Sequence, residues 1–271
     1  MKIAMIQFSV TADKADNLVR AAAAIRQAAE NGADMAVLPE MFCCPYGNDY
    51  FAQYGEAEGG PAQQTLSALA AELGIYIIGG SLPELVGDKI FNTSYVYDRQ
   101  GQLLAKHRKM HLFDINVEGG QRFMESDTLS PGNSITTFET EFGTMGLCIC
   151  FDLRFEELAR CMCLRGARAI FVPAAFNMTT GPAHWELLFW QRAVDNQCFT
   201  VGVSPARDET AGYVAYGNSI AVEPWGTVLC RAGAQEETLI AELDLSRLEA
   251  VRRQLPILSA RRTDLYEVSE R

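Results

Sequence analysis

The sequence lacks any apolar run long enough to cross a membrane. None of its segments approaches the roughly 18 uninterrupted apolar residues that suggest a transmembrane helix. The apolar run at 3–10 is too short for a signal peptide, and it has no cleavage-like site of small residues. We therefore expect a cytoplasmic protein without a membrane partner.

Positive charge is scarce as well. The 271 residues include 23 Lys and Arg against 34 Asp and Glu, which gives a net charge of −11 at pH 7. Sequence-independent binding of nucleic acid or of an anionic membrane needs concentrated positive charge, so we expect neither partner. An anionic small-molecule substrate would need a local cationic side chain.

Metal-ligating patterns are also missing. The chain has only three histidines and no Cys-x-x-Cys pair, so we predict no structural metal site. Its eight cysteines would suggest disulfides in a short secreted chain. In a cytosolic chain we expect thiols, most of them packed as small apolar side chains.

The residues that are present indicate one ordinary globular domain. The composition is 48% hydrophobic and 21% charged, and no linker or low-complexity tract divides the chain. Strand patterns alternate with helical ones, with strands at 2–10, 34–38, 75–80, 144–149, 169–172 and 198–204 and helices at 18–29, 61–73, 155–165 and 183–196. Antiparallel pairing enters with a hairpin at 92–107 and strands at 218–222, 227–230 and 238–243. We predict an α/β fold, a four-layer α-β-β-α sandwich of two mixed sheets with outer helices.

Two segments fall outside this alternation. The stretch 110–133 has the composition of a loop, and ordered loops of that length usually serve a site. The tail after 244 predicts a helix and then an extended arm at roughly 255–271, whose apolar side chains need a surface to cover. A partner subunit is one candidate, so we expect a single domain over 1–271 that forms a homodimer or a larger homo-oligomer.

Cys150 is the candidate nucleophile. It ends an apolar strand, a helix is predicted to begin a few residues later, and Asp152 is a plausible N-cap for that helix. The partial positive charge of a helix N-terminus favours a thiolate. A buried apolar role, as for Cys148, is the alternative. Only Cys150, however, lies at the carboxyl end of its strand, where α/β sheets bind ligands.

Two charged residues could complete the chemistry. Glu40 follows an apolar strand and Pro39, so its carboxylate should be partly desolvated and a better base near neutral pH, although a helix cap or a salt-bridge partner fits equally well. Lys109, judged alone, is a solvated surface charge. Together with Cys150 they supply what amide hydrolysis requires, a base for the thiol and a cation for the oxyanion. The backbone N–H of Phe151 is a further donor to that oxyanion.

These residues lie in three segments that resemble the nitrilase, or carbon-nitrogen hydrolase, superfamily. The segments are Leu-Pro-Glu at 38–40, Lys-His-Arg-Lys-Met-His-Leu-Phe at 106–113 and Gly-Leu-Cys-Ile-Cys-Phe-Asp-Leu-Arg-Phe at 146–155. They match in order, and the resemblance covers nearly the whole chain. It implies that Glu40 is the general base, that Lys109 stabilises the oxyanion and donates a proton, and that Cys150 is the nucleophile. It also implies that Glu125 is a second active-site glutamate, which positions substrate and lysine.

Within the superfamily the sequence is most similar to the omega-amidase (Nit2-like) branch. The segments at 173–186 and 204–208 carry this similarity. A true nitrilase would be expected to carry Cys-Trp-Glu at its nucleophile, whereas this chain has Cys-Phe-Asp. The resemblance implies cleavage of the terminal amide of short dicarboxylic monoamides, 2-oxoglutaramate and 2-oxosuccinamate. The products would be the acid and ammonia, formed through a cysteine acyl-enzyme with no metal or organic cofactor.

Such a substrate carries a carboxylate distant from the scissile amide, and the site must hold it. Arg154, expected in the first turn of the helix after the nucleophile, could bind this carboxylate. A structural ion pair of Arg154 with Asp152 or Glu157 is the alternative. Phe176 and Thr180, in the loop after the strand at 169–172, are further candidates for the substrate pocket.

Other functions stay open on the sequence alone. Another branch of the same superfamily, such as a deaminated-glutathione amidase or an N-carbamoyl amino acid hydrolase, would use the same chemistry. A non-catalytic interaction protein would be expected to lack at least one of Glu40, Lys109 and Cys150, and all three are present. A thiol redox or metal-handling protein ranks lowest, because the cysteine spacing supports neither role.

Overall fold

Alternating side chains of short strands are buried on both faces of the sheets. In the computed structural model, strand β1 (Lys2–Gln7) directs Ile3 and Met5 toward the other sheet and Ala4 and Ile6 toward the helices. All four are fully buried. Successive side chains of a strand point to opposite faces, so a strand that is covered on both faces must be apolar throughout.

The structure describes residues 1–119 and 121–270. The first sheet has seven strands, in the order β15 (Glu237–Glu242), β1, β2 (Met35–Val37), β3 (Tyr76–Ile78), β5 (Lys89–Tyr97) and β4 (Leu82–Val86), with β6 (Leu103–Arg108) also paired to β5. β1, β2 and β3 are parallel, and the other pairs are antiparallel. This sheet is therefore mixed, as predicted.

The second sheet is also mixed. Its six strands follow the order β14 (Val228–Arg231), β13 (Ile220–Val222), β12 (Phe199–Val203), β11 (Ala169–Pro173), β10 (Gly143–Leu147) and β9 (Thr136–Thr140). β10, β11 and β12 are parallel, and the pairs at both edges are antiparallel. Side chains of β1 and β2 pack against those of β10, β11 and β12 to form the central core between the sheets.

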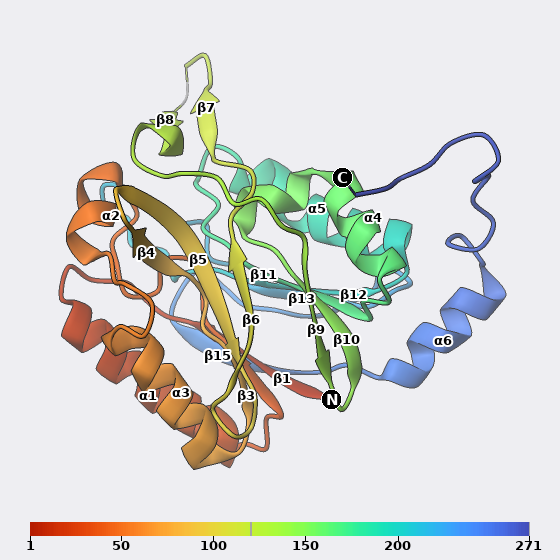
Figure 1. Ribbon diagram of the computed structural model, residues 1–271, viewed down its shortest axis with the longest axis horizontal. Helices are drawn as coiled ribbons and strands as arrows, with labels where there is room; N and C mark the ends of the chain where they lie inside the picture. Colours follow the sequence, from red (N-terminus) through yellow and green to blue (C-terminus); the bar gives the residue numbers. More distant parts are fainter. Residues whose placement is uncertain (120, 271) are drawn as a thin grey trace.

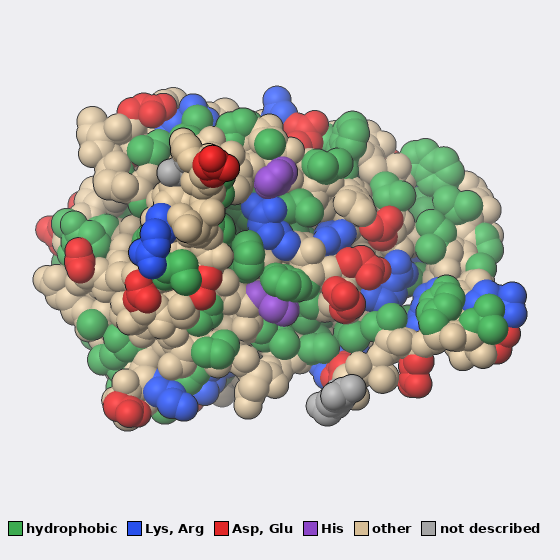
Figure 2. Space-filling model, turned by 90° about the horizontal axis from the view of Figure 1, so that it is seen from above, with side chains coloured by type: hydrophobic (Ala, Val, Ile, Leu, Met, Phe, Trp, Pro, Cys, Tyr) green, Lys and Arg blue, Asp and Glu red, His purple; other side chains and the backbone are tan. Residues whose placement is uncertain are grey.

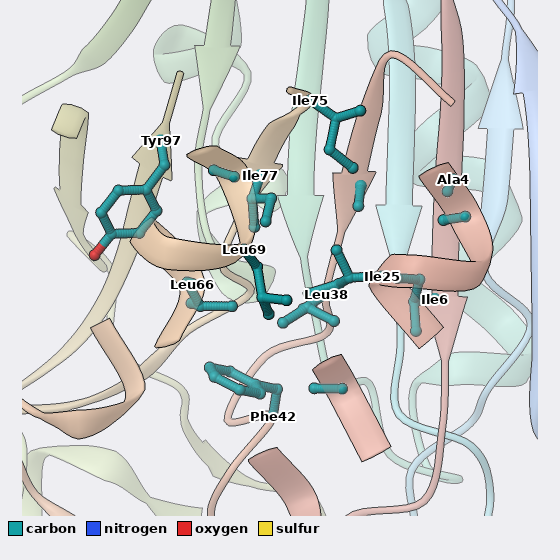
Figure 3. Close-up of a cluster of buried hydrophobic side chains, with 14 of the residues drawn as sticks. Ala4, Ile6, Ile25, Leu38, Phe42, Leu66, Leu69, Ile75, Ile77 and Tyr97 are labelled. Carbon is teal, nitrogen blue, oxygen red and sulfur yellow. The ribbon is translucent and has the colours of Figure 1, made fainter. Parts of the chain in front are cut away.

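Helices cover the outer face of each sheet (Figure 1). The helices are α1 (Lys14–Glu30) and α3 (Pro61–Leu73) on the first sheet, α4 (Glu156–Leu164) and α5 (Gly181–Asn196) on the second, the short α2 (Asn48–Tyr54), and α6 (Leu245–Gln254). Figure 3 shows Ile25 of α1 and Leu66 and Leu69 of α3 packed over Ile6 and Ile77 of the first sheet. The predicted four-layer α-β-β-α sandwich is confirmed.

Gly80 brings the end of β3 against the segment that carries Glu40. Gly80 has φ of +55°, and a Cβ atom built on it would lie 2.1 Å from the carbonyl oxygen of Pro39. The next residue, Ser81, donates its N–H to that same oxygen and accepts from the Met41 N–H through its hydroxyl. A side chain at position 80 would therefore push Glu40 away, and only glycine fits there.

Several elements differ from the sequence-based prediction. The segment 110–133 is not simply a loop, because β7 (Asp114–Asn116) and β8 (Arg122–Met124) pair within it. Strands β4 and β9 and helix α2 were not predicted either. β4 pairs with the next strand, β5, across a tight turn at 87–88, and β9 pairs with β10 across a tight turn at 141–142. Strand formation depends more on such pairing than on local propensity, so their own sequences carry a weak signal. Within the described residues, no helix is both long and apolar enough to span a membrane.

Candidate active site

The four predicted catalytic side chains meet where strands of the two sheets end. Glu40 follows β2, Lys109 follows β6, and Cys150 follows β10, while Glu125 begins the short 3₁₀ helix η1 (Glu125–Asp127). The exposed fraction is 3% for Cys150 and 0% for the other three. The Lys109 Nζ atom lies 2.9 Å from Glu40 Oε1 and 3.0 Å from Glu125 Oε1.

Cys150 occupies a sharp turn at the end of its strand. Its φ is +48°, in the left-handed region that non-glycine residues rarely adopt, and it starts the 3₁₀ helix η2 (Cys150–Arg154). Such strained backbone is often found at functional sites, where it holds a side chain in a defined place. The turn is similar in shape to a nucleophile elbow, which presents the nucleophile above the sheet.

The surroundings of Cys150 favour the neutral thiol over the thiolate. Burial, followed by the charge of Glu40, raises the pKa of Cys150 well above its ordinary value. The charge of Lys109 and the N–H of Ala175 lower this pKa by less. The helix N-terminus that was expected to favour the thiolate does not lie at Cys150, because α4 begins only at Glu156. A thiol in these surroundings would need a base to act as the predicted nucleophile.

Glu40 is placed to be that base. Its Oε1 atom accepts hydrogen bonds from Lys109 and from the Asn92 amide at 2.8 Å, and its Oε2 atom accepts from the Ala175 N–H at 2.8 Å. Burial, with a smaller contribution from the charge of Glu125, raises the pKa of Glu40 against the opposing effect of Lys109. A carboxylate with a raised pKa is a stronger base near neutral pH, as predicted from its place after an apolar strand.

Lys109 is not the solvated surface charge that its local sequence suggests. Burial alone would lower its pKa, but the charges of Glu125 and Glu40 outweigh burial and raise the pKa of Lys109 above its ordinary value. The ammonium ion is therefore retained. The backbone of Lys109 is fixed as well, since its N–H donates to the Asn92 carbonyl and its carbonyl accepts from the Gly132 N–H.

Three residues that were not predicted surround Lys109 and the two carboxylates paired with it. Asn92 bonds to both Glu40 and the Lys109 backbone. The Tyr46 hydroxyl donates to Glu125 and lies 3.4 Å from the Lys109 Nζ atom. The ring of Tyr213 packs on that of Tyr46, with centroids 4.3 Å apart. Two features of the sequence could have indicated these residues. Asn92 is an amide within an apolar strand, and Tyr46 follows the candidate base Glu40 by six residues.

A small cavity, too closely packed to admit a water molecule, adjoins the thiol. It is lined by Phe113, Cys150, Phe151, Arg154, Ala175, Phe176 and Thr180. It thus brings together the predicted nucleophile, the residue whose N–H was predicted to bind the oxyanion, and all three predicted substrate-binding residues. A larger cleft of about 690 Å³ reaches Glu40 and Tyr46 from the other side, and Ala175 lines both spaces.

Arg154 is the one cationic side chain among the described residues that line the small cavity. It ends η2 and does not lie in the first turn of α4. Its guanidinium lies 4.9 Å from the Phe176 ring centroid and 3.2 Å from His184 Nδ1. In the described part of the chain, Arg154 forms no ion pair with a carboxylate, so the alternative of a structural ion pair is not observed. The buried Nε atom of Arg154 has no hydrogen-bond partner.

Asp152 does not cap α4, contrary to the sequence-based prediction. That helix begins at Glu156 without a side-chain cap. The Asp152 carboxylate instead points inward and accepts hydrogen bonds from Ile149 and from the segment around Lys109. Across residues 1–119 and 121–270, no group of three or more His, Cys, Asp and Glu side chains could hold a metal ion.

Comparison with known proteins gives a consistent result. A family model for carbon-nitrogen hydrolases matches residues 2–253. The chain is 50% identical over 270 residues to the omega-amidase NIT2 of Mus musculus, covering 100% of this chain and 98% of that protein. It is 49% identical over 267 residues to the omega-amidase NIT2 of Homo sapiens, covering 98% and 97%.

The structural comparison agrees with the sequence comparison. The structure of Nit3 from Saccharomyces cerevisiae, a member of branch 10 of the nitrilase superfamily, superposes with a TM-score of 0.90 at 42% identity, covering 97% of this chain and 96% of that one. The chain therefore belongs to the carbon-nitrogen hydrolase family of the nitrilase superfamily.

Proposed function

We propose that the protein is an omega-amidase that hydrolyses the terminal amide of short dicarboxylic monoamides, 2-oxoglutaramate and 2-oxosuccinamate, to the acid and ammonia. The observation that carries the proposal is that Cys150 and Arg154 line the same small cavity, which side-chain movement would have to widen for a substrate. A substrate with an amide at one end and a carboxylate at the other matches these two groups. The naming of relatives at about 50% identity as omega-amidases supports the same activity.

The first half of the reaction forms an acyl-enzyme. Glu40 takes the thiol proton while the sulfur of Cys150 bonds to the amide carbon and the carbonyl electrons move to oxygen. Lys109 and the Phe151 N–H stabilise that oxyanion. When the C–N bond breaks, Lys109 donates a proton to the leaving nitrogen and regains the proton held by Glu40 across their 2.9 Å contact. Ammonia leaves, and Glu125 keeps the ammonium of Lys109 in place.

The second half regenerates the thiol. Glu40 removes a proton from water as the water oxygen attacks the thioester carbon, and the oxyanion again faces Lys109. When the C–S bond breaks, the proton returns from Glu40 to the sulfur of Cys150 and the acid is released. No step in this scheme uses a metal or an organic cofactor.

The substrate carboxylate would bind at Arg154. Charge-assisted hydrogen bonds from a guanidinium suit a carboxylate, and the unpartnered Nε atom of Arg154 leaves a donor for it. The rings of Phe151 and Phe176 flank the guanidinium and would cover the short carbon chain of the substrate. Thr180, already bonded to Asn177, would close the far side of the cavity.

We also propose that residues 1–271 form one domain of a cytoplasmic homodimer, with the arm at 255–271 at the subunit interface. Leu265 and Tyr266 in the arm are 70% and 54% exposed within a single chain. On α5, Trp190 is 45% exposed and shares a face with other exposed apolar residues, Leu187 and Val194. Figure 2 shows hydrophobic side chains at the end of the molecule where α6 and the arm project.

Replacement of the nucleophile tests the chemistry. We expect Cys150→Ala to reduce ammonia release from 2-oxoglutaramate by at least about 1000-fold, because no acyl-enzyme can form. Cys148→Ala is the matched control, since Cys148 is equally buried on the same strand end but does not line the cavity. It should retain turnover within a few-fold. Ammonia release that survives in Cys150→Ala would contradict the proposed mechanism.

Removal of the cation tests the substrate class. We expect Arg154→Leu to raise KM for 2-oxoglutaramate by about 10- to 100-fold, which is the loss of one or two charge-assisted hydrogen bonds. The KM for an uncharged amide of similar length should change little, because that substrate has no carboxylate to bind. An equal rise in KM for both substrates would reject the carboxylate-binding role.

Sedimentation tests the assembly. At micromolar concentration the wild type should sediment with about twice the 29.9 kDa mass of the chain. Trp190→Glu should weaken association by at least about tenfold, since buried aromatic residues dominate many interfaces. Val19→Glu, on the outer helix α1, is the control for adding charge to an exposed apolar position and should leave association unchanged. A monomeric wild type would contradict the proposed dimer.

A further inference from the structure

Asp152 joins the two segments that carry Lys109 and Cys150. It is 1% exposed and its carboxylate accepts five hydrogen bonds. Oδ1 accepts from Met110 N at 3.2 Å, His111 N at 2.9 Å and His111 Nδ1 at 2.8 Å, and Oδ2 accepts from Ile149 N at 3.0 Å and His107 Nε2 at 2.9 Å. One carboxylate thus holds residues on both sides of Lys109 and the residue directly before Cys150.

These contacts cross from one sheet to the other. His107 lies on β6 of the first sheet, whereas Asp152 and Cys150 follow β10 of the second sheet. The other ring nitrogen of His107 lies 2.9 Å from the Thr136 hydroxyl on β9, also in the second sheet. Apolar packing between sheets tolerates small shifts, but short hydrogen bonds to a charged group fix position and direction.

The histidines extend this contact to the cavity. The ring of His111 stacks on that of Phe155, with centroids 3.6 Å apart and an interplanar angle of 12°. Phe155 in turn contacts the Phe151 ring edge-on. Asp152 therefore fixes the backbone next to Lys109. Through His111 and Phe155 it is also connected to Phe151, whose N–H faces the oxyanion in the proposed reaction.

Asp152 remains an anion in this setting. Burial alone would raise its pKa, but hydrogen bonds from His107 and His111 outweigh burial and hold the pKa of Asp152 below its ordinary value. The proposed reaction does not use this charge, since Asp152 accepts no proton and does not line the cavity. A buried charge with five donors and no chemical task needs another explanation.

We propose that Asp152 is a positioning residue that sets the distance between Lys109 and Cys150, with His107 and His111 as its partners. This inference rests on the proposed function, because the distance matters only if both groups act on one carbonyl. The amide carbon must bond to sulfur while its oxygen faces the ammonium. A misplacement of about 1 Å in such an arrangement can reduce rate by about 100-fold.

Asp152→Asn is the principal test. Asparagine has nearly the same shape, but its NH2 group would face at least one backbone N–H donor that cannot reverse, so the segment must shift. We expect kcat for 2-oxoglutaramate to fall about 100-fold while KM changes no more than about threefold. The Asp152 carboxylate makes no hydrogen bond to Arg154, which is why KM should change little.

Glu84→Gln is the matched control. Glu84 is also fully buried and bonds to Lys106, Arg108 and Thr93, so it touches the same strand β6 but not the turn at Cys150. Both variants should lose melting temperature, but Glu84→Gln should keep kcat within about threefold. If Glu84→Gln loses kcat as much as Asp152→Asn does, a general loss of structure explains both, and the positioning role is rejected.

A second pair of variants covers the case in which Asp152→Asn does not fold. His111→Ala removes a side-chain donor to Asp152, whereas His111→Asn can restore a donor near the position of Nδ1. We expect kcat to fall by about tenfold in His111→Ala and to recover most of that loss in His111→Asn. Equal activity of the two variants would overturn the role of this contact.

The rate of Cys150 alkylation by iodoacetamide, followed by mass spectrometry, separates this inference from the proposed function. We expect Asp152→Asn to slow alkylation at neutral pH by about tenfold, because Glu40 no longer meets the thiol correctly. A wild type that is alkylated but does not hydrolyse 2-oxoglutaramate would reject the proposed substrate only. Unchanged kcat and unchanged alkylation in a folded Asp152→Asn would reject the positioning role.

Discussion

The ammonium of Lys109, buried between the carboxylates of Glu40 and Glu125, is the interaction on which the site depends. Each of these charges would be strongly unfavourable alone in the interior, and they are tolerated because they are paired and hydrogen-bonded. The same pairing keeps Lys109 charged and Glu40 basic beside a neutral thiol. The charges that pair in the folded site are thus the ones that the proposed hydrolysis uses.

The site also depends on how the two sheets meet. Glu40 and Lys109 belong to the first sheet and Cys150 to the second, and directional bonds near the site cross between the sheets. The Ala175 N–H, after β11, donates to Glu40, and Asp152 binds the segment around Lys109. Gly80 adds a steric requirement, since it lets the backbone that carries Glu40 approach β3. The large apolar core between the sheets supplies stability, and these few polar contacts supply position.

Local signals were enough to predict the layers and part of the site. The helix at 61–73 was predicted at its observed bounds, because its initial proline and the glycine after its end are local features. Glu40 and Cys150 were predicted from their places at strand ends. The burial of Lys109 could not be predicted from its neighbours, because its partners lie 69 and 16 residues away. Asp152 was assigned to a helix cap for the same reason, since most of its donors come from 41 to 45 residues earlier.

The most direct test of this account is the pH dependence of stability when Lys109 is replaced by methionine. Loss of the ammonium removes a contribution that lowers the pKa of Glu40, so that pKa should rise further above the ordinary 4.5. A group whose pKa is higher in the folded than in the unfolded state stabilises the folded protein at low pH. This stabilisation is lost as the pH rises through the folded-state pKa. We predict that Lys109→Met lowers the free energy of unfolding in urea by about 3–5 kcal/mol near pH 8 and by less near pH 6. Lys106→Met, three residues earlier and partly exposed, should cost at most about 1 kcal/mol at either pH. Equal losses for the two variants at both pH values would contradict a buried charge network at the centre of the site.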